Sequence, residues 1–163
     1  MASFDTVSEV NMQELDNAVN NLKKELNTRF DFKGSNTEVE LNKKDKLIKI
    51  ITTDNMKMNM LREMLISAAT KRSVDARCLE FGEVEKAGGS MLRREVKIKE
   101  GIDKDTAKKI TTAVKESKLK VQASIMDDKV RIQGKKIDDL QAVIQILKGL
   151  DLPLPLQFIN MKS

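Results

Sequence analysis

Apolar and polar residues alternate along two short stretches, 120–125 and 129–133, that flank a polar turn. This period of two predicts a β-hairpin whose two faces carry different side chains. The inward face holds only apolar residues, namely Val121, Ala123, Ile125, Val130 and Ile132. The outward face is polar and basic, with Lys120, Gln122, Ser124, Lys129, Arg131 and Gln133. None of the outward side chains is equipped for covalent chemistry, so the hairpin is predicted to dock an anionic ligand.

The rest of the chain repeats one arrangement of helices and strands. Apolar residues spaced three and four apart predict helices over about 12–28, 54–71, 103–114 and 137–147. Apolar runs predict strands at 3–10, 37–41, 47–53, 74–81, 91–99 and 156–159, besides the hairpin. In chain order this is βαββαβ followed by βαββαβ, with about 80 residues per copy. The predicted class is α+β, with two ferredoxin-like βαββαβ domains.

Short connections predict that the two copies exchange terminal strands. Only the loop 82–89 separates strand 74–81 from the strand that follows, and short loops favour neighbouring strands. By the same logic, the strand around Phe158 is expected to pair with strand 3–10 and to tie the chain end to its beginning. The predicted first domain comprises residues 1–75 and 153–163, and the predicted second, basic domain comprises residues 76–152.

Charge distinguishes the two halves of the sequence. Residues 1–84 carry 13 Lys and Arg against 14 Asp and Glu, a net charge of −1. Residues 85–163 carry 17 against 11, a net charge of +6. This asymmetry has two explanations: an anionic partner such as nucleic acid or a nucleotide, or a solvated lysine-rich surface that aids solubility.

Composition argues against most enzyme classes. The chain has no histidine, which removes the commonest acid/base group at neutral pH and the commonest metal ligand. Asp138 and Asp139 begin a predicted helix, where carboxylates complement the helix dipole without a catalytic role. The single Cys78 excludes a disulfide framework and is expected to be buried. We therefore predict a non-enzymatic protein with no metal site and no cofactor.

Neither a membrane span nor a signal peptide is predicted. No apolar run approaches the roughly 20 residues that cross a bilayer, and the first residues lack the cationic and apolar regions of a secretory signal. We therefore expect a cytoplasmic protein.

Two turns carry candidate recognition chemistry. Gly134 and Lys135, between a strand and a helix, offer backbone N–H groups and positive charge that would hold one phosphate. The same residues also fit a plain strand-to-helix turn with solvated lysines. The stretch Arg29–Gly34 offers a guanidinium, a carboxylate, two rings and a glycine, which together would grip a purine nucleotide. The alternative is that both Phe side chains plug the helix-to-strand connection while Arg29 and Asp31 pair.

Five motifs spread along the chain resemble those of the YajQ family of nucleotide-binding proteins. They are SFDTVSEV at 3–10, RFDFKG at 29–34, KLKVQA at 118–123, GKKIDDLQAV at 134–143 and QFIN at 157–160. The resemblance implies two ferredoxin-like domains with exchanged strands in a small cytosolic protein of bacterial type. It also implies binding of a nucleotide or nucleic acid, and for some members a role as a cyclic di-GMP receptor that affects transcription.

The chain departs from this family pattern at two places. Its residues 155–161, PLQFINM, have two fewer rings than the aromatic-rich PFQF-x-NF that the family usually shows, which argues against stacking there. Ser73 stands where the family usually has glycine, directly after Lys71 and Arg72.

The leading hypothesis is a regulatory receptor for a guanine-type nucleotide such as GTP or cyclic di-GMP, acting with a transcription regulator. Lys120, Arg131 and Lys135 would contact phosphate, and Arg29 with Asp31 would contact the base. The full set of predicted ligand-binding residues is Arg29, Asp31, Phe32, Lys33, Lys118, Lys120, Gln122, Arg131 and Lys135.

Two alternatives use other surfaces. RNA or tRNA would bind the basic sheet face of the second domain through Arg93, Lys97, Lys99, Lys120, Lys129 and Arg131. The hairpin has no aromatic residue, which weakens base stacking there but leaves electrostatic binding. A protein-interaction adaptor would use the methionine-rich helix start at Met56, Met58 and Met60, or the sheet edges.

Overall fold

The computed structural model describes every residue from Met1 to Ser163. The chain forms two compact units: unit 1 contains Met1–Glu9 and Glu100–Ser163, and unit 2 contains Val10–Lys99. Each unit has its own sheet, its own hydrophobic core and two of the four α-helices. The α+β class is therefore confirmed. None of the helices combines the length and the apolar character that crossing a bilayer requires.

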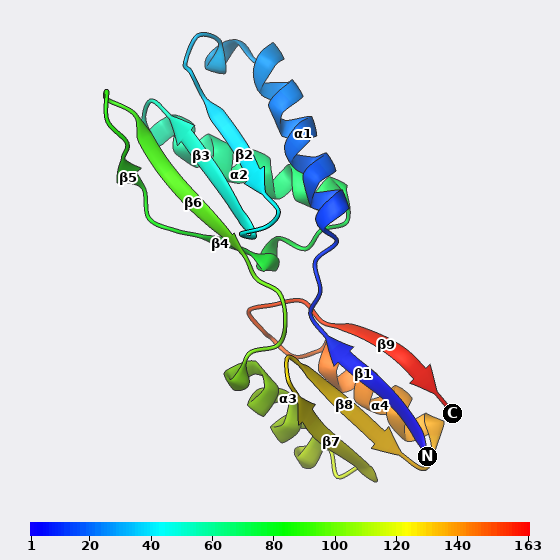
Figure 1. Ribbon diagram of the computed structural model, residues 1–163. Coiled ribbons are helices and arrows are strands. Elements are labelled where there is room, and N and C mark those ends of the chain that lie inside the picture. Colours follow the sequence, from blue (N-terminus) through cyan, green and yellow to red (C-terminus); the bar gives the residue numbers. More distant parts are fainter. The chain divides into compact units, whose positions relative to one another are not determined.

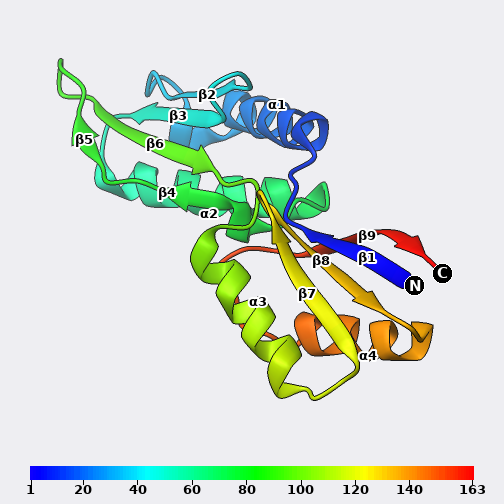
Figure 2. The same ribbon diagram turned by 60° about the horizontal axis from the view of Figure 1, so that its bottom comes forward.

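Unit 1 is a four-stranded antiparallel sheet with both of its helices on one face (Figures 1 and 2). The strands lie in the order β7 (Val121–Met126), β8 (Lys129–Gly134), β1 (Ala2–Val7) and β9 (Gln157–Lys162). The two helices are α3 (Lys104–Glu116) and α4 (Ile137–Lys148). Phe4, Ile110, Ile132 and Leu140 are fully buried where helices and sheet meet. The opposite face of the sheet carries the alternating polar side chains.

Unit 2 has a second antiparallel sheet with the order β2, β3, β6 and β4. The bounds are β2 (Glu38–Asn42), β3 (Leu47–Thr52), β6 (Leu92–Ile98), β4 (Leu79–Phe81) and the short β5 (Glu85–Lys86), which pairs with β6. Helices α1 (Met12–Thr28) and α2 (Asn55–Lys71) pack on each other and on this sheet. Their apolar faces bury Val39, Ile48, Ile50 and Val96. Cys78 is buried as expected, in the 3-10 turn Ala76–Cys78.

Three helices begin at residues whose side chains cap them. The side chains of Asn11, Asp54 and Asp103 accept hydrogen bonds from backbone N–H groups three residues later, which caps α1, α2 and α3. Helix α4 differs, because its N-cap residue Lys136 makes no side-chain capping bond. Asp138 and Asp139 in its first turn supply complementary negative charge instead, as predicted.

Both strand pairings predicted from short connections are present. Strand β4 pairs antiparallel with β6, with Leu79 opposite Ile98. Strand β9 pairs antiparallel with β1, with Phe158 opposite Thr6. Phe158 also meets Phe4 edge to face, with ring centroids 5.8 Å apart, which fastens the end of the chain to its beginning.

The division of the chain differs from the predicted one. Strand β6 pairs with β3 as well as with β4, so residues 76–99 belong to the same unit as residues 10–75. Strand β1 pairs with β8 and β9, so the first nine residues belong with 100–163 and not with a domain of residues 1–75. A short loop predicts that two consecutive strands pair with each other. It does not predict the pairs β1–β8 and β3–β6, which decide this division.

The observed division also redistributes the charge. Unit 2 holds 18 Lys and Arg against 14 Asp and Glu, a net charge of +4, whereas unit 1 holds 12 against 11, a net charge of +1. The basic hairpin therefore lies in the nearly neutral unit. Any preference of this hairpin for anions depends on the local arrangement of its charges.

Candidate functional site

The nine predicted binding residues are distributed over both units. Unit 1 contains Lys118, Lys120, Gln122, Arg131 and Lys135. Unit 2 contains Arg29, Asp31, Phe32 and Lys33. The predicted phosphate contacts and the predicted base contacts thus belong to different folding units, and each group forms a candidate site of its own.

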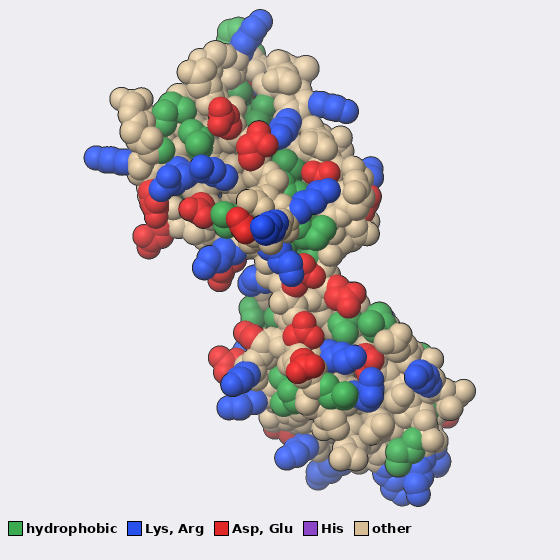
Figure 3. Space-filling view, viewed as in Figure 1, with side chains coloured by type: hydrophobic (Ala, Val, Ile, Leu, Met, Phe, Trp, Pro, Cys, Tyr) green, Lys and Arg blue, Asp and Glu red, His purple; other side chains and the backbone are tan.

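Lys120, Gln122 and Lys135 line one cavity of about 370 Å³ in unit 1. The cavity lies where β7 begins, β8 ends and α4 starts, and the first residue of the chain forms part of its wall. Its lining consists of Met1, Lys120, Val121, Gln122, Gln133, Gly134, Lys135, Lys136 and Asp139. On the face seen in Figure 3, Lys and Arg side chains gather near this end of unit 1.

Gly134 allows the hairpin to close tightly beside this cavity. A Cβ at this position would lie 3.0 Å from Cγ1 of Val121 and 3.3 Å from the carbonyl oxygen of Lys120. Strands β7 and β8 are in register here, with Val121 opposite Gly134 and Gln122 opposite Gln133. The two glutamine amides are therefore cross-strand neighbours in the cavity wall.

The lysines of this cavity have no partners within the chain. Lys120, Lys135 and Lys136 are exposed, and none of them makes an ion pair or a side-chain hydrogen bond. Asp139 is the single carboxylate of the lining. Three unpaired ammonium groups around a small cavity match a ligand with several anionic oxygens, such as a phosphate chain. Lys118 is exposed in the turn after α3, with a φ of +57°, and lies outside the lining.

Arg131 has an internal partner that the local sequence pattern does not reveal. Its Nε donates to Oδ1 of Asp5 at 2.8 Å, and its Nη2 donates to Oδ2 at 3.5 Å. Asn160 donates to the same carboxylate at 3.2 Å, and Nζ of Lys129 lies 3.6 Å from it. Asp5 is only 3% exposed. The hydrogen bond from Arg131, supported by Asn160 and Lys129, outweighs the effect of burial and lowers the pKa of Asp5 to about 2.

This network limits what Arg131 can offer to a ligand. Its guanidinium and the ammonium of Lys129 neutralise a buried carboxylate, so their first role is structural. The outward-facing residues of the hairpin are therefore of two kinds. Lys120 and Gln122 line the cavity and are free, whereas Arg131 and Lys129 are held by Asp5.

The turn Arg29–Gly34 in unit 2 adopts part of the alternative arrangement, in which Arg29 pairs with Asp31 and the Phe rings fill the helix-to-strand connection. Arg29 donates from Nε and Nη2 to the two carboxylate oxygens of Asp31, at 3.1 and 3.0 Å, and this hydrogen bonding lowers the pKa of Asp31. Phe32 is 4% exposed in the unit 2 core, which removes its ring from the residues available for stacking on a base. Phe30 is 91% exposed, so only one of the two rings plugs the connection. Lys33 is exposed and has no ion pair.

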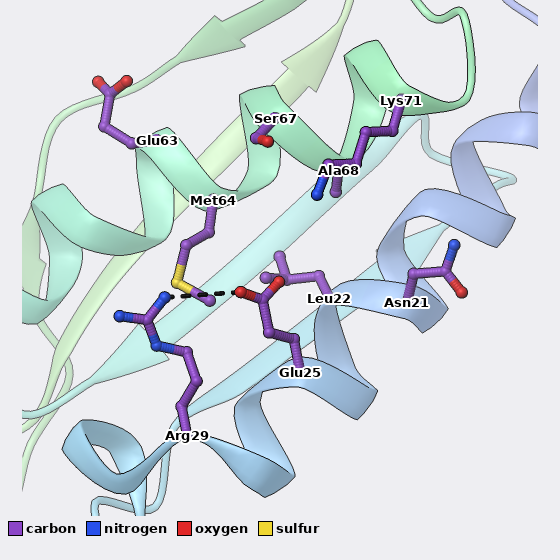
Figure 4. Close-up of a pocket in the computed structure, with 9 residues that line it drawn as sticks. All are labelled: Asn21, Leu22, Glu25, Arg29, Glu63, Met64, Ser67, Ala68 and Lys71. Atoms are coloured by element: carbon purple, nitrogen blue, oxygen red, sulfur yellow. Dashed lines mark ion pairs between the residues drawn. The ribbon is translucent and has the colours of Figure 1, made fainter.

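A groove of about 290 Å³ between α1 and α2 begins at the same turn (Figure 4). At its end, Nη1 of Arg29 lies 3.5 Å from Oε1 of Glu25. The remaining lining residues are Asn21, Leu22, Glu63, Met64, Ser67, Ala68 and Lys71. Two acidic and two basic side chains balance each other in this lining, so the groove has no net attraction for an anion.

The residues predicted to bind RNA are distributed over both units. Arg93 and Lys97 lie on β6 in unit 2, whereas Lys120, Lys129 and Arg131 lie on the hairpin of unit 1. A cavity of about 440 Å³ beside β6 is lined by Glu80, Phe81, Gly82, Glu83, Glu85, Arg93, Glu95 and Lys97. Arg93 donates to Glu85 at 2.9 Å. Four glutamates beside two cations make this part of the unit 2 face acidic.

The three methionines at the start of α2 differ in their exposure. Met56 is 68% exposed, whereas Met58 is buried in the core and Met60 packs against it. Ile125, predicted to face the core, is 53% exposed at the end of the edge strand β7. Single exposed apolar residues of this kind are normal on a protein surface.

Fold and site together define a class of protein: a two-unit α+β chain whose clearest site is a small cavity lined by unpaired lysines. The family model described as "Nucleotide-binding protein YajQ-like" matches residues 2–162. The chain belongs to this family, as its motifs predict.

Full-length relatives carry a matching description. A "Nucleotide-binding protein" of Nitratidesulfovibrio vulgaris (strain DSM 19637 / Miyazaki F) is 56% identical over 163 residues, which is 100% of both chains. Proteins of the same name from Oleidesulfovibrio alaskensis and Geotalea daltonii are 55% and 50% identical over 163 residues, again covering 100% of both chains.

Proposed function

We propose that the chain is a non-enzymatic nucleotide-binding protein whose unit 1 cavity holds the phosphate groups of its ligand. The observation that carries this proposal is the presence of three exposed, unpaired lysines, Lys120, Lys135 and Lys136, around one cavity of about 370 Å³. The names of the family and of its relatives support the ligand class. The absence of histidine supports a binding role over turnover.

The residues of the cavity have distinct roles in this proposal. Lys120, beside the start of β7, and Lys135, beside the end of β8, contact phosphate oxygens, and Gln122 donates or accepts at the sugar or base. Arg131 makes no direct contact with the ligand in this proposal, because its guanidinium is hydrogen-bonded to Asp5 and its charge is largely offset there. Lys118 attracts the ligand from outside the cavity and makes no defining contact.

The proposed ligand is a guanine nucleotide, either GTP or cyclic di-GMP, and the proposed role is regulation through a transcription regulator. In unit 2, Arg29, Asp31 and Lys33 are proposed as a second contact region. Arg29 and Asp31 read a base only after their mutual pair opens, whereas Lys33 is free to meet a phosphate. Phe32 has an anchoring role in this region.

Each unit is proposed to be a ferredoxin-like domain completed by an exchanged strand. In unit 1 the chain order β1, α3, β7, β8, α4, β9 and the sheet order β7, β8, β1, β9 support this description. In unit 2, β6 occupies the sheet position that β1 has in unit 1.

Isothermal titration calorimetry with GTP, cyclic di-GMP and ATP tests the proposal. Lys120→Gln and Lys135→Gln should each weaken binding about tenfold, because each removes one charge-assisted hydrogen bond to phosphate. Lys108→Gln is the matched control, since Lys108 is an exposed lysine of α3 in the same unit and lies outside the cavity. Absence of binding by all three nucleotides at moderate salt, or unchanged affinity in both cavity variants, would sink the proposal.

A further inference from the structure

Phe30 is the most exposed large apolar side chain of the protein. Its ring is 91% accessible, whereas Phe4 and Phe32 are buried and Phe81 and Phe158 are partly buried. The chain has no Tyr or Trp, so this is its one freely accessible aromatic ring. A solvated Phe ring gains nothing from the hydrophobic effect, so its full aromatic face is available to a ligand.

The backbone that carries Phe30 is held by several independent contacts. The Lys33 N–H donates to the Phe30 carbonyl at 3.3 Å, which closes the 3-10 turn Phe30–Phe32. Ser35 donates to the Phe32 carbonyl from both its N–H, at 3.2 Å, and its Oγ, at 2.7 Å. The buried Phe32 ring fixes the turn to the core of unit 2, and the side chains of Arg29 and Asp31, on either side of Phe30 in the chain, pair with each other.

This rigidity lowers the entropic cost of contact at the ring. The turn backbone is already fixed, so a ligand that covers the ring orders little more than one side-chain rotation. Preorganised aromatic side chains of this kind are suited to binding flat partners.

The surroundings of Phe30 are polar and carry unpaired positive charge. Its neighbours in the chain are Arg29 and Asp31, and Lys33 follows without an ion pair. Lys57 at the start of α2 helps to lower the pKa of Asp31, but its ammonium pairs with Asp54 at 3.1 Å, so Lys33 is the unpaired cation of this region. A protein-docking patch would need contiguous apolar surface around the ring, which these neighbours do not supply. An exposed ring beside one unpaired lysine instead matches an unpaired base next to its phosphate.

We propose that the Phe30 turn is a stacking platform for an unpaired base of single-stranded nucleic acid, with Lys33 on the adjacent phosphate. This site lies entirely in unit 2 and uses none of the residues of the unit 1 cavity, although it shares Lys33 with the second contact region proposed above. It also differs from the sheet-face site predicted for RNA, since no strand residue takes part in it.

Fluorescence anisotropy with a labelled single-stranded RNA of about 12 nucleotides and mixed sequence tests this platform. At low salt, Phe30→Ala should weaken binding by the full chain about tenfold, while Phe30→Trp should bind as tightly as the wild type or more tightly. Phe30→Leu should behave like Phe30→Ala, because it keeps apolar bulk but loses the π-face. Lys33→Gln should reduce the slope of log affinity against log salt by about 0.7.

Met56→Ala is the matched control, since it removes another exposed apolar side chain from unit 2 and should leave RNA affinity unchanged. Circular dichroism should show that all Phe30 variants remain folded, because the ring makes no core contact.

The proposal is overturned if the wild type does not bind the RNA at low salt, or if Phe30→Ala binds as well as the wild type. Full affinity in Phe30→Leu would also overturn it, because that result indicates apolar contact and not stacking. Calorimetry with GTP on Phe30→Ala separates the two sites, since the nucleotide affinity of the unit 1 cavity should not change. Lys120→Gln is the converse test: it should weaken nucleotide binding to the unit 1 cavity and leave RNA binding at the Phe30 turn unchanged.

Discussion

Ser73 occupies a backbone position that favours glycine, and this makes it the most direct test of the fold of unit 2. Its φ is +62°, directly after the end of α2. The Ser73 N–H donates to the Thr70 carbonyl at 3.0 Å and the Val74 N–H donates to the Ala69 carbonyl at 2.9 Å, the two bonds of a Schellman motif. The Ser73 side chain is exposed and makes no hydrogen bond, so nothing offsets the strain at its Cβ.

Ser73→Gly is therefore expected to stabilise unit 2. A left-handed backbone costs an L-residue roughly 1–2 kcal/mol relative to glycine. The added freedom of glycine in the unfolded chain costs about 0.4–1 kcal/mol. The difference leaves a gain of about 0.5–1 kcal/mol in the free energy of unfolding, which corresponds to a rise in Tm of roughly 2–8 °C for a unit of this size.

Differential scanning calorimetry measures this gain and shows which transition moves. Ser73→Ala keeps the Cβ, so it should change Tm by no more than about 1 °C. Ser67→Gly lies inside α2 and should lower stability by about 0.5 kcal/mol, because glycine is the poorer helix former. If Ser73→Gly gave no rise while Ser67→Gly gave its expected fall, the assignment of backbone strain to Ser73 would be refuted.

Three substitutions test unit 1. Asp5→Asn should lower the free energy of unfolding at neutral pH by about 2 kcal/mol in urea denaturation, given a folded pKa of about 2 against an ordinary 3.8. A depressed pKa stabilises the fold above the unfolded value and loses this effect as pH falls, so wild-type stability should drop more steeply than that of Asp5→Asn between about pH 5 and pH 2. Gly101→Ala should cost more than about 1 kcal/mol, because φ is +82° and its Cβ would lie 2.9 Å from Cβ of Asp128. Asp103→Ala should lower Tm through the loss of about 1 kcal/mol of helix capping.

Each of these has a matched control in the same unit. Asp151→Asn alters an exposed carboxylate and should leave the acid-unfolding curve as it is. Gly149→Ala adds a Cβ at a φ of −84°, with its nearest neighbour at 3.5 Å, and should cost far less than Gly101→Ala. Asp103→Asn keeps a capping acceptor and should retain most of the stability. Equal effects of a substitution and its control would contradict the reasoning for that position.

Much of the fold was predictable because local signals determine it. Asn11, Asp54 and Asp103 mark helix starts because their side chains cap the first turn. The eight-residue loop 82–89 strongly favours the pairing of β4 with β6. The partition into units was not predictable in this way. It depends on β6 joining β3 and on β1 joining β8, and both are pairings between residues far apart in the sequence.

The same difference explains the outcome at the candidate sites. Lys120, Gln122 and Lys135 are brought together by a hairpin and its adjoining turn, so local pattern was enough to group them. The burial of Phe32 does not follow from the sequence, because a 3-10 turn points successive side chains in different directions and the sequence does not show which of two rings enters the core.

Asp5 changes which residues of the basic hairpin are available to bind an anion. Alternation in SFDTVSEV places Asp5 on the polar face of its strand, but only the pairing of β1 with β8 sets it opposite Arg131. Once paired, Arg131 and Lys129 serve the fold, and their charge is largely offset by a carboxylate that stays ionised down to about pH 2. The positive charge that remains for a ligand is concentrated at the other end of the hairpin, where Lys120 and Lys135 meet no carboxylate partner. An anion is therefore expected to select the cavity over the sheet face, although the sheet face carries the more prominent basic pattern in the sequence.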